Sequence, residues 1–123
     1  MVIEKTMAKK ISYYRNKADK ALQKSLIKIN QFCEICGKPT SCHHHFYPKS
    51  SCSALRYEED NMIPVCVGCH LGFHSNRSAD FIGRTIEKRG IDWFNNLQRI
   101  RSRIIKPTKK YYEEMYDFYT REE

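Results

Sequence analysis

The sequence lacks any long apolar run. The first ten residues, MVIEKTMAKK, carry charges with no apolar segment behind them, so we expect no signal peptide, and no stretch reaches the ~20 residues of a transmembrane helix. Repeats and low-complexity segments are absent as well. We therefore expect one compact domain in 123 residues, no membrane partner, and a reducing, cytoplasmic location. In such a compartment disulfides are rare, and grouped cysteines are more often metal ligands.

Positive charge is plentiful but unevenly distributed. The net charge is +8, and residues 1–30 carry eight Lys or Arg against two acidic residues, while 83–110 carry nine against two. Residues 31–82 are nearly neutral and 111–123 are acidic. Two basic flanks around a neutral centre predict a polyanionic partner, most simply nucleic acid. The alternative, that these lysines only make a soluble surface, remains open at this point.

Apolar periodicity predicts helices on both sides of a short, irregular centre. Helical spacing runs from Met7 to Ile29, and no Gly or Pro interrupts it. Further helices are predicted from a Ser78 cap to about Lys88 with Gly90 as the stop, from Trp93 to Ile104 before Pro107, and around Tyr112–Tyr119. The prediction is an α+β fold that is mostly helical outside its core.

The centre of the chain suits two short strands and one helix. Phe46 and Tyr47 favour one strand, and Met62–Val65 favours another, with Pro64 restricting it to an edge or strand end. A polar connection over 49–60 joins them, and His70 is predicted to open a helix that carries His74. We expect three segments of one compact domain: a basic helix at 1–30, a core at 31–78 and C-terminal helices at 79–123.

Four cysteines form two C-x2-C pairs, Cys33 with Cys36 and Cys66 with Cys69, separated by 29 residues. Two such turns supply four thiolates, a closed tetrahedral shell that zinc favours, so the site is predicted to be structural. Its binding free energy would then be folding free energy. An iron–sulfur cluster is the alternative, although nothing else indicates electron transfer. Cys42 and Cys52 remain, and we interpret them as ordinary thiols.

Histidines form a second group. His70 and His74 are spaced i, i+4 and face the same way on a helix, and that helix starts beside the cysteine pair. The stretch CHHHFYPK places three more histidines before a strand. Two histidines from a helix and one from a facing strand could hold a divalent ion with open positions, which is a catalytic arrangement. The alternative is that some histidines only pack around the zinc site and bind no second ion.

These residues carry a resemblance to a known family. The run HH-x2-P-K-S, followed by R-Y-x3-N-x-I-P-V-C-x2-C-H-x3-H, resembles the HNH nucleases, whose fold is the ββα-metal or His-Me finger. The match covers roughly residues 33–75. The runs KADKALQK and I-x-K-R-G-I-D-W also resemble the phage recombination nucleases called NinG or Rap. The resemblance implies a zinc-stapled ββα-metal core with flanking amphipathic helices, acting in a bacterial or phage-infected cell.

The resemblance also implies roles for individual residues. The general base precedes the proline by three positions, which selects His45, and the residue before it binds the catalytic metal, which selects His44. His43 falls outside the pattern. Asn61 matches the asparagine that fixes the hairpin, and His70 and His74 match the closing histidines, of which both bind the metal or one contacts phosphate. The catalytic ion would be Mg²⁺, Mn²⁺, Ni²⁺ or Zn²⁺, and imidazole ligands favour the softer ions.

The expected function is that of a metal-dependent DNA endonuclease that hydrolyses phosphodiester bonds. The family resemblance implies recombination or branched DNA intermediates as its substrates. Other recombination or phage DNA-processing proteins are the expected partners, and the oligomeric state is open. The alternatives are a zinc-knuckle nucleic-acid-binding module without catalysis and a purely structural zinc protein. The candidate nucleic-acid-binding residues are Lys49, Arg56, Arg77, Arg84, Lys88 and Arg89.

Overall fold

The computed structural model describes residues 9–121, and the chain divides into two compact units. The larger unit runs from Leu26 to Lys106, and the smaller one combines the chain up to Ser25 with the chain from Pro107 onwards. The segments expected from the sequence, 1–30, 31–78 and 79–123, stay a prediction.

Helices dominate both units, and a small sheet lies in the larger one. In chain order the elements are α2 (Ile11–Ile29), β1 (Cys42–His45), two single 3₁₀ turns (Ser53–Leu55 and Glu59–Asn61), β2 (Met62–Val65), α3 (Val67–Phe73), α4 (Ser78–Arg89), α5 (Ile91–Arg101) and α6 (Lys109–Thr120). Among the described residues no helix is both long and apolar enough to cross a membrane. The cytoplasmic location stays a prediction.

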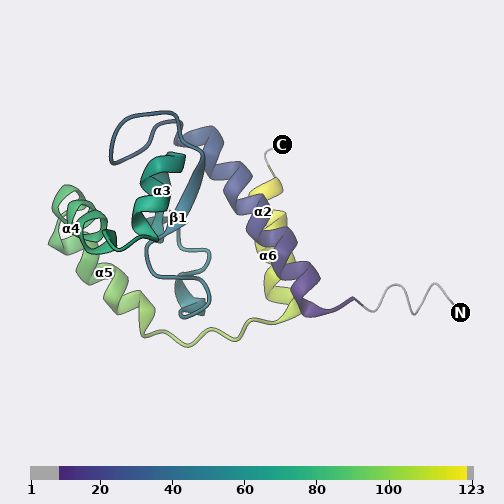
Figure 1. Ribbon diagram of the computed structural model, residues 1–123. Coiled ribbons are helices and arrows are strands. Elements are labelled where there is room, and N and C mark those ends of the chain that lie inside the picture. The colour runs from purple at the N-terminus through teal and green to yellow at the C-terminus, as the bar shows by residue number, and fades with distance from the viewer. Residues whose placement is uncertain (1–8, 122–123) are drawn as a thin grey trace, which may run out of the picture. The chain divides into compact units, whose positions relative to one another are not determined.

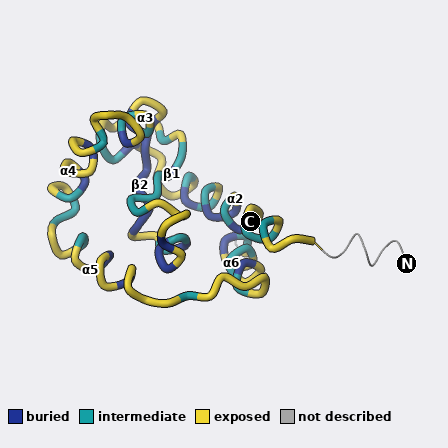
Figure 2. The backbone as a smooth tube through the Cα atoms, turned by 60° about the horizontal axis from the view of Figure 1, so that its bottom comes forward, coloured by how far each residue is buried: buried dark blue, intermediate teal, exposed yellow. Residues whose placement is uncertain are grey.

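The sheet consists of β1 and β2, paired antiparallel, and α3 follows β2 directly. Figure 1 labels β1 and α3. The register sets Cys42 opposite Val65 and His44 opposite Ile63. Every residue of β2 is buried, as Figure 2 shows. This helix-rich structure with one small antiparallel sheet confirms the α+β expectation at that coarse level.

Strand β1 ends earlier than the sequence indicated. We expected Phe46 and Tyr47 to be in the strand, but β1 stops at His45. The backbone N–H of Tyr47 donates instead to Oδ1 of Asn61 at 2.9 Å, and its carbonyl accepts from Nδ2 at 3.1 Å. A buried side chain therefore takes the hydrogen bonds that a neighbouring strand would have made.

Three helix boundaries also differ from the predictions. Helix α3 begins at Val67 rather than His70, because the Cys66 sulfur caps it by accepting from the N–H of Cys69. Ser78 is the first residue of α4 rather than its cap. Helix α5 ends at Arg101, so Ile104 no longer shares its buried face and is 91% exposed. Of the first predicted helix, residues 7 and 8 lie outside the described range.

Two apolar clusters support the larger unit. The first joins β2, α3 and α4 and contains Ile63, Val65, Phe73 and Phe81 with three of the paired cysteines. The second joins the 3₁₀ turn at Ser53–Leu55 to α5. Helices α3 and α4 approach closely at Gly72, where an added Cβ would lie 2.3 Å from the Phe81 ring. A side chain at that position would separate α4 from the helix that carries the histidines.

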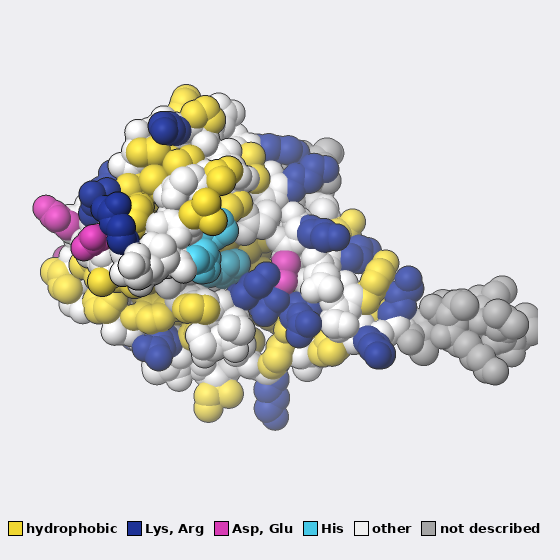
Figure 3. Space-filling model, viewed as in Figure 1, with side chains coloured by type: hydrophobic (Ala, Val, Ile, Leu, Met, Phe, Trp, Pro, Cys, Tyr) yellow, Lys and Arg dark blue, Asp and Glu magenta, His cyan; other side chains and the backbone are white. Residues whose placement is uncertain are grey.

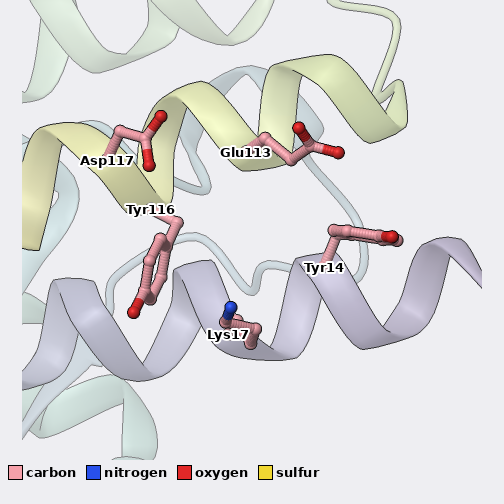
Figure 4. Close-up of a pocket in the computed structure, with 5 residues that line it drawn as sticks. All are labelled: Tyr14, Lys17, Glu113, Tyr116 and Asp117. Atoms are coloured by element: carbon pink, nitrogen blue, oxygen red, sulfur yellow. The ribbon is translucent and has the colours of Figure 1, made fainter. Parts of the chain in front are cut away.

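In the smaller unit, the first part of α2 faces α6. Ala18 and Leu22 of α2 and Tyr112 and Tyr119 of α6 are buried, in agreement with the predicted apolar stripes. A cavity of about 290 Å³ lies between the two helices. Its lining, drawn in Figure 4, consists of Tyr14, Lys17, Glu113, Tyr116 and Asp117.

Candidate metal centres

The two C-x2-C pairs meet in the larger unit. The sulfur atoms of all four cysteines lie within 4.8 Å of one another. The first pair sits in a tight turn in which the N–H of Gly37, at φ +81°, donates to the carbonyl of Cys33. The second pair opens α3. All six cysteines lie in the described part of the chain and are free of disulfide bonds, and the four paired ones are close enough to hold one metal ion.

The cysteine cluster fits a tetrahedral ion. Four sulfurs at the Zn–S distance of about 2.3 Å are separated by roughly 3.8 Å, and Sγ of Cys36 lies 3.5 Å from Sγ of Cys66. The backbone N–H of Cys69 and the thiols around Cys66 lower the pKa of Cys66 to about 7. Burial raises the pKa of Cys69. Four thiols in one place cannot all ionise without a cation, so this donor set suits a structural metal such as zinc.

Three histidines form a second cluster of ligand atoms. His44 comes from β1, His70 from α3 and His74 from the C-cap of α3, and their ligand nitrogens lie within 4.8 Å of one another. Nε2 of His70 lies 3.1 Å from Nε2 of His74. His44 and His70 are half-buried and His74 is exposed; Figure 3 shows histidine side chains reaching the surface.

Packing and burial keep His44 a neutral imidazole, which is the form that binds a metal. Its ring stacks on Phe73 with the centroids 4.5 Å apart and the planes 25° apart. Burial, and then the neighbouring His70 and His74, lower the pKa of His44 to about 3. Burial and His74 also lower the pKa of His70. Metals bind the neutral imidazole, so the cluster keeps lone pairs available at neutral pH and suits a divalent ion with positions left open.

The strand register separates the three adjacent histidines. Because side chains alternate along a strand, His44 faces α3 while His43 faces the other way. His43 is 3% exposed, and its Nε2 lies 3.3 Å from Nδ2 of Asn30. Burial, and then the nearby Arg89 charge, lower the pKa of His43 to about 4. His43 therefore belongs to the interior of the unit and stands apart from the metal cluster.

His45 has a fixed orientation at the end of β1. Its Nε2 lies 3.0 Å from the backbone carbonyl of Arg56. A carbonyl can only accept, so Nε2 carries the proton and Nδ1 is the basic nitrogen. Arg56 lies in the loop between the strands, so this hydrogen bond joins the end of β1 to that loop.

Asn61 organises that loop. Its side chain is fully buried and makes three hydrogen bonds to backbone: two with Tyr47, and one from Nδ2 to the carbonyl of Leu55 at 3.2 Å. The carbonyl of Asn61 also accepts from the N–H of Phe46 at 2.8 Å. These contacts hold the chain immediately after His45.

The six basic candidates have different surroundings. Lys49, Arg77, Arg84 and Lys88 are exposed, and Arg56 is half-buried. Arg77 lies 3.7 Å from Asp80, and Lys88 donates to the carbonyl of Glu34. The guanidinium groups of Arg77 and Arg84 both approach the Phe81 ring. Arg77 is the N-cap of α4, and Arg84 and Lys88 lie within that helix.

Arg89 has a structural role that the sequence reasoning missed. Its guanidinium makes a bidentate pair with Glu34, with both N···O distances 2.7 Å, and donates to the carbonyls of Asp60 and Met62. It also lies over the Trp93 ring, whose Nε1 donates to Asp60 as well. Because Glu34 lies inside the first C-x2-C turn, Arg89 ties that turn to the residues on both sides of Asn61. No spacing in the sequence indicates this pair, which is separated by 55 residues.

Cys42 makes a contact that the sequence reasoning did not indicate. We interpreted it as an ordinary thiol, and its Sγ lies 3.3 Å from Nδ1 of His70. The strand period was the available signal, because Cys42 lies two residues before His44 and shares its face. Cys52 fits the original interpretation better: it is buried in the second apolar cluster, near the carbonyl of Arg101.

Comparison with known proteins adds one partial similarity. No protein-family model matches the chain, and no solved structure matches it. A stretch of 49 residues is 43% identical to a protein described as a mitochondrial DNA mismatch repair protein, a mutS homolog, from Sarcophyton glaucum. That stretch covers 37% of this chain and 5% of the relative. The chain thus spans a small part of the relative's length.

Proposed function

We propose that this protein is a metal-dependent DNA endonuclease of the HNH type. The observation that carries the proposal is the gathering of His44, His70 and His74 within 4.8 Å, with the oriented imidazole of His45 next to His44 in the chain. The order of two antiparallel strands and a helix, β1–β2–α3, supports it. So does the partial similarity to a protein whose description names DNA mismatch repair.

His45 is the proposed general base. Its Nε2–H stays hydrogen-bonded to the carbonyl of Arg56, and Nδ1 takes a proton from the water that attacks the phosphorus. The new bond joins the water oxygen to phosphorus, and the bond from phosphorus to the 3′ oxygen breaks. The products are a 5′-phosphate and, once that oxygen takes a proton from solvent, a 3′-hydroxyl.

The other residues of the site hold and position. His44, His70 and His74 would hold the divalent ion, which supplies positive charge where the phosphoryl and leaving oxygens gain negative charge. Asn61 keeps the loop after His45 in place, and exposed cations such as Arg77 and Arg84 would contact the DNA backbone. Such contacts give affinity without reading sequence. Recombination or branched DNA is the proposed preferred substrate.

The test is cleavage of supercoiled, single-stranded and branched DNA with Mg²⁺, Mn²⁺, Ni²⁺ or Zn²⁺ added, by the wild type and three histidine variants. His45→Ala should lose about 10²–10⁴-fold in rate while keeping its zinc and its DNA affinity. His44→Ala should lose activity through weaker ion binding, so excess ion should partly restore it. His43→Ala is the matched control, because the same side chain is removed one position before His44.

The His43 variant should cleave within a small factor of the wild type, although loss of a buried side chain should lower its stability by about 1–3 kcal/mol. An inactive His43→Ala beside an active His45→Ala would refute the assignment of the base. A wild type that binds DNA yet cleaves none of the three substrates with any ion would replace the proposal with the non-catalytic zinc-knuckle alternative.

A further inference from the structure

The histidine cluster is contacted by Cys42, which is not one of its three candidate ligands. Sγ of Cys42 lies 3.3 Å from Nδ1 of His70, while Nε2 of the same ring lies 3.1 Å from Nε2 of His74. The two nitrogens of His70 therefore point to different partners. Cys42 is outside the cysteine cluster, whose four sulfurs come from the C-x2-C pairs.

The chemistry of imidazole gives this contact a consequence. A neutral imidazole has one N–H and one lone pair, and only the nitrogen with the lone pair can bind a metal. A partner that accepts the N–H on one nitrogen fixes the lone pair on the other and also fixes the rotation of the ring. For His70 the nitrogen near His74 must carry the lone pair, so Nδ1 must carry the proton.

We propose that Cys42 is a positioning residue of the histidine centre, with its sulfur accepting the hydrogen bond from Nδ1–H of His70. This rests on the histidine centre of the proposed function and adds one residue to it. The strand makes the arrangement precise: Cys42 and His44 lie on the same face of β1, one pleat apart, so the strand that supplies one ligand also orients another. Sulfur is a weak acceptor, so losing it should weaken ion binding by an amount near the lower end of the roughly 10–100-fold range that is typical for partners of metal-binding histidines.

The experiment measures ion binding to the full-length protein directly. With zinc retained in the cysteine cluster, Co²⁺ is added and the visible absorption of the histidine centre gives its dissociation constant. Cys42→Ala should weaken Co²⁺ binding by about tenfold, since loss of such a partner typically costs 10–100-fold. Cys42→Ser, whose hydroxyl can accept, should restore most of the affinity. Cys52→Ala and Cys52→Ser are the matched controls, because they change a cysteine in a different cluster and should leave the affinity unchanged.

A second measurement reports the proton itself. Long-range ¹H–¹⁵N spectra distinguish the two neutral forms of histidine, and before Co²⁺ is added His70 should carry its proton on Nδ1 in the wild type and in Cys42→Ser. In Cys42→Ala the two forms should become mixed. A purely structural role for Cys42 would lower the melting temperature without changing this ratio.

The outcomes separate the two proposals. Equal Co²⁺ affinity in the wild type and Cys42→Ala, or equal losses in the Ala and Ser variants, would overturn the role of Cys42. Tighter binding in Cys42→Ala would also overturn it, because the thiol would then be donating to Nδ1 and holding the proton on Nε2. A wild type that binds no ion beyond the one in the cysteine cluster would remove the histidine centre, and with it the proposed function.

Discussion

Replacing Asn61 tests how the loop between the strands is held. Its side chain is 0% exposed and makes hydrogen bonds of 2.9, 3.1 and 3.2 Å to backbone groups of Tyr47 and Leu55. At about 1 kcal/mol for each net hydrogen bond, Asn61→Ala should lower the free energy of unfolding by roughly 3 kcal/mol. The larger unit has 81 residues, from Leu26 to Lys106, and for this size such a loss lowers the melting temperature by about 12–24 °C.

Asn61→Asp sharpens the test because it keeps the shape of the side chain. A carboxylate can still accept from the N–H of Tyr47, but it faces the carbonyls of Tyr47 and Leu55 where the amide had donated. Burial and these two carbonyls should raise the pKa of the new carboxyl above its value in the unfolded chain. The unfolded state then loses its proton first as pH rises, so the variant should be least destabilised near pH 4 and progressively worse towards pH 7.

The assay is thermal unfolding followed by circular dichroism at fixed zinc concentration, with Asn95→Ala as the control. Asn95 is exposed on α5, and its replacement should change stability by less than about 0.5 kcal/mol. Cleavage measured below the melting temperature should also fall, by about 10²-fold if the chain after His45 moves by ~1 Å. An Asn61→Asp protein as stable as the wild type at pH 7 would refute the hydrogen-bond assignment, and a fully active Asn61→Ala would refute its positioning role.

The remaining predictions concern the support of both centres. Metal analysis should find one tightly held zinc per chain that survives mild chelation, and Cys66→Ser should unfold the larger unit; a folded Cys66→Ser protein without zinc would contradict this. Arg89→Lys keeps the charge but loses the bidentate fork, so it should lower stability by about 1–2 kcal/mol, whereas Arg84→Lys on the exposed face of α4 should change nothing measurable. Equal melting temperatures for these two variants would show that the Glu34 contact contributes little.

Local spacing was enough to predict which cysteines and histidines lie together, but not the long-range contacts around them. The C-x2-C pairs and the i, i+4 histidines are short-range patterns, and the structure brings each set together within 4.8 Å. Helix existence was predicted well for α2 and α6, because long apolar periodicity is a strong signal. The strand end at His45 and the start of α3 at Val67 were missed, since each is decided by one side chain, that of Asn61 or Cys66, taking over backbone hydrogen bonds.

The supporting contacts were beyond the sequence for a different reason. Arg89 meets Glu34 across 55 residues, and Cys42 meets His70 across 28. Nothing in composition or periodicity brings such pairs together before the fold is known. Phosphate binding by Arg89 and an ordinary thiol at Cys42 stay predictions from the sequence, and the tertiary contacts add partners that the sequence did not indicate.

The histidine centre depends on the cysteine cluster, and the cysteine cluster does not depend on the histidine centre. Helix α3 has seven residues, too few to be stable alone, yet it carries Cys69 and His70 and has His74 as its C-cap. Its first turn is capped by the sulfur of Cys66, so an ion in the cysteine cluster fixes the helix that presents two of the three histidines. Loss of the structural ion should therefore abolish binding at the histidine centre. Loss of an ion from the histidine centre leaves the cap, the apolar cluster and the Arg89 contacts intact, so the fold should persist without it. The divalent ion proposed for the histidine centre can thus be weakly held and exchangeable, because the fold is expected not to depend on it.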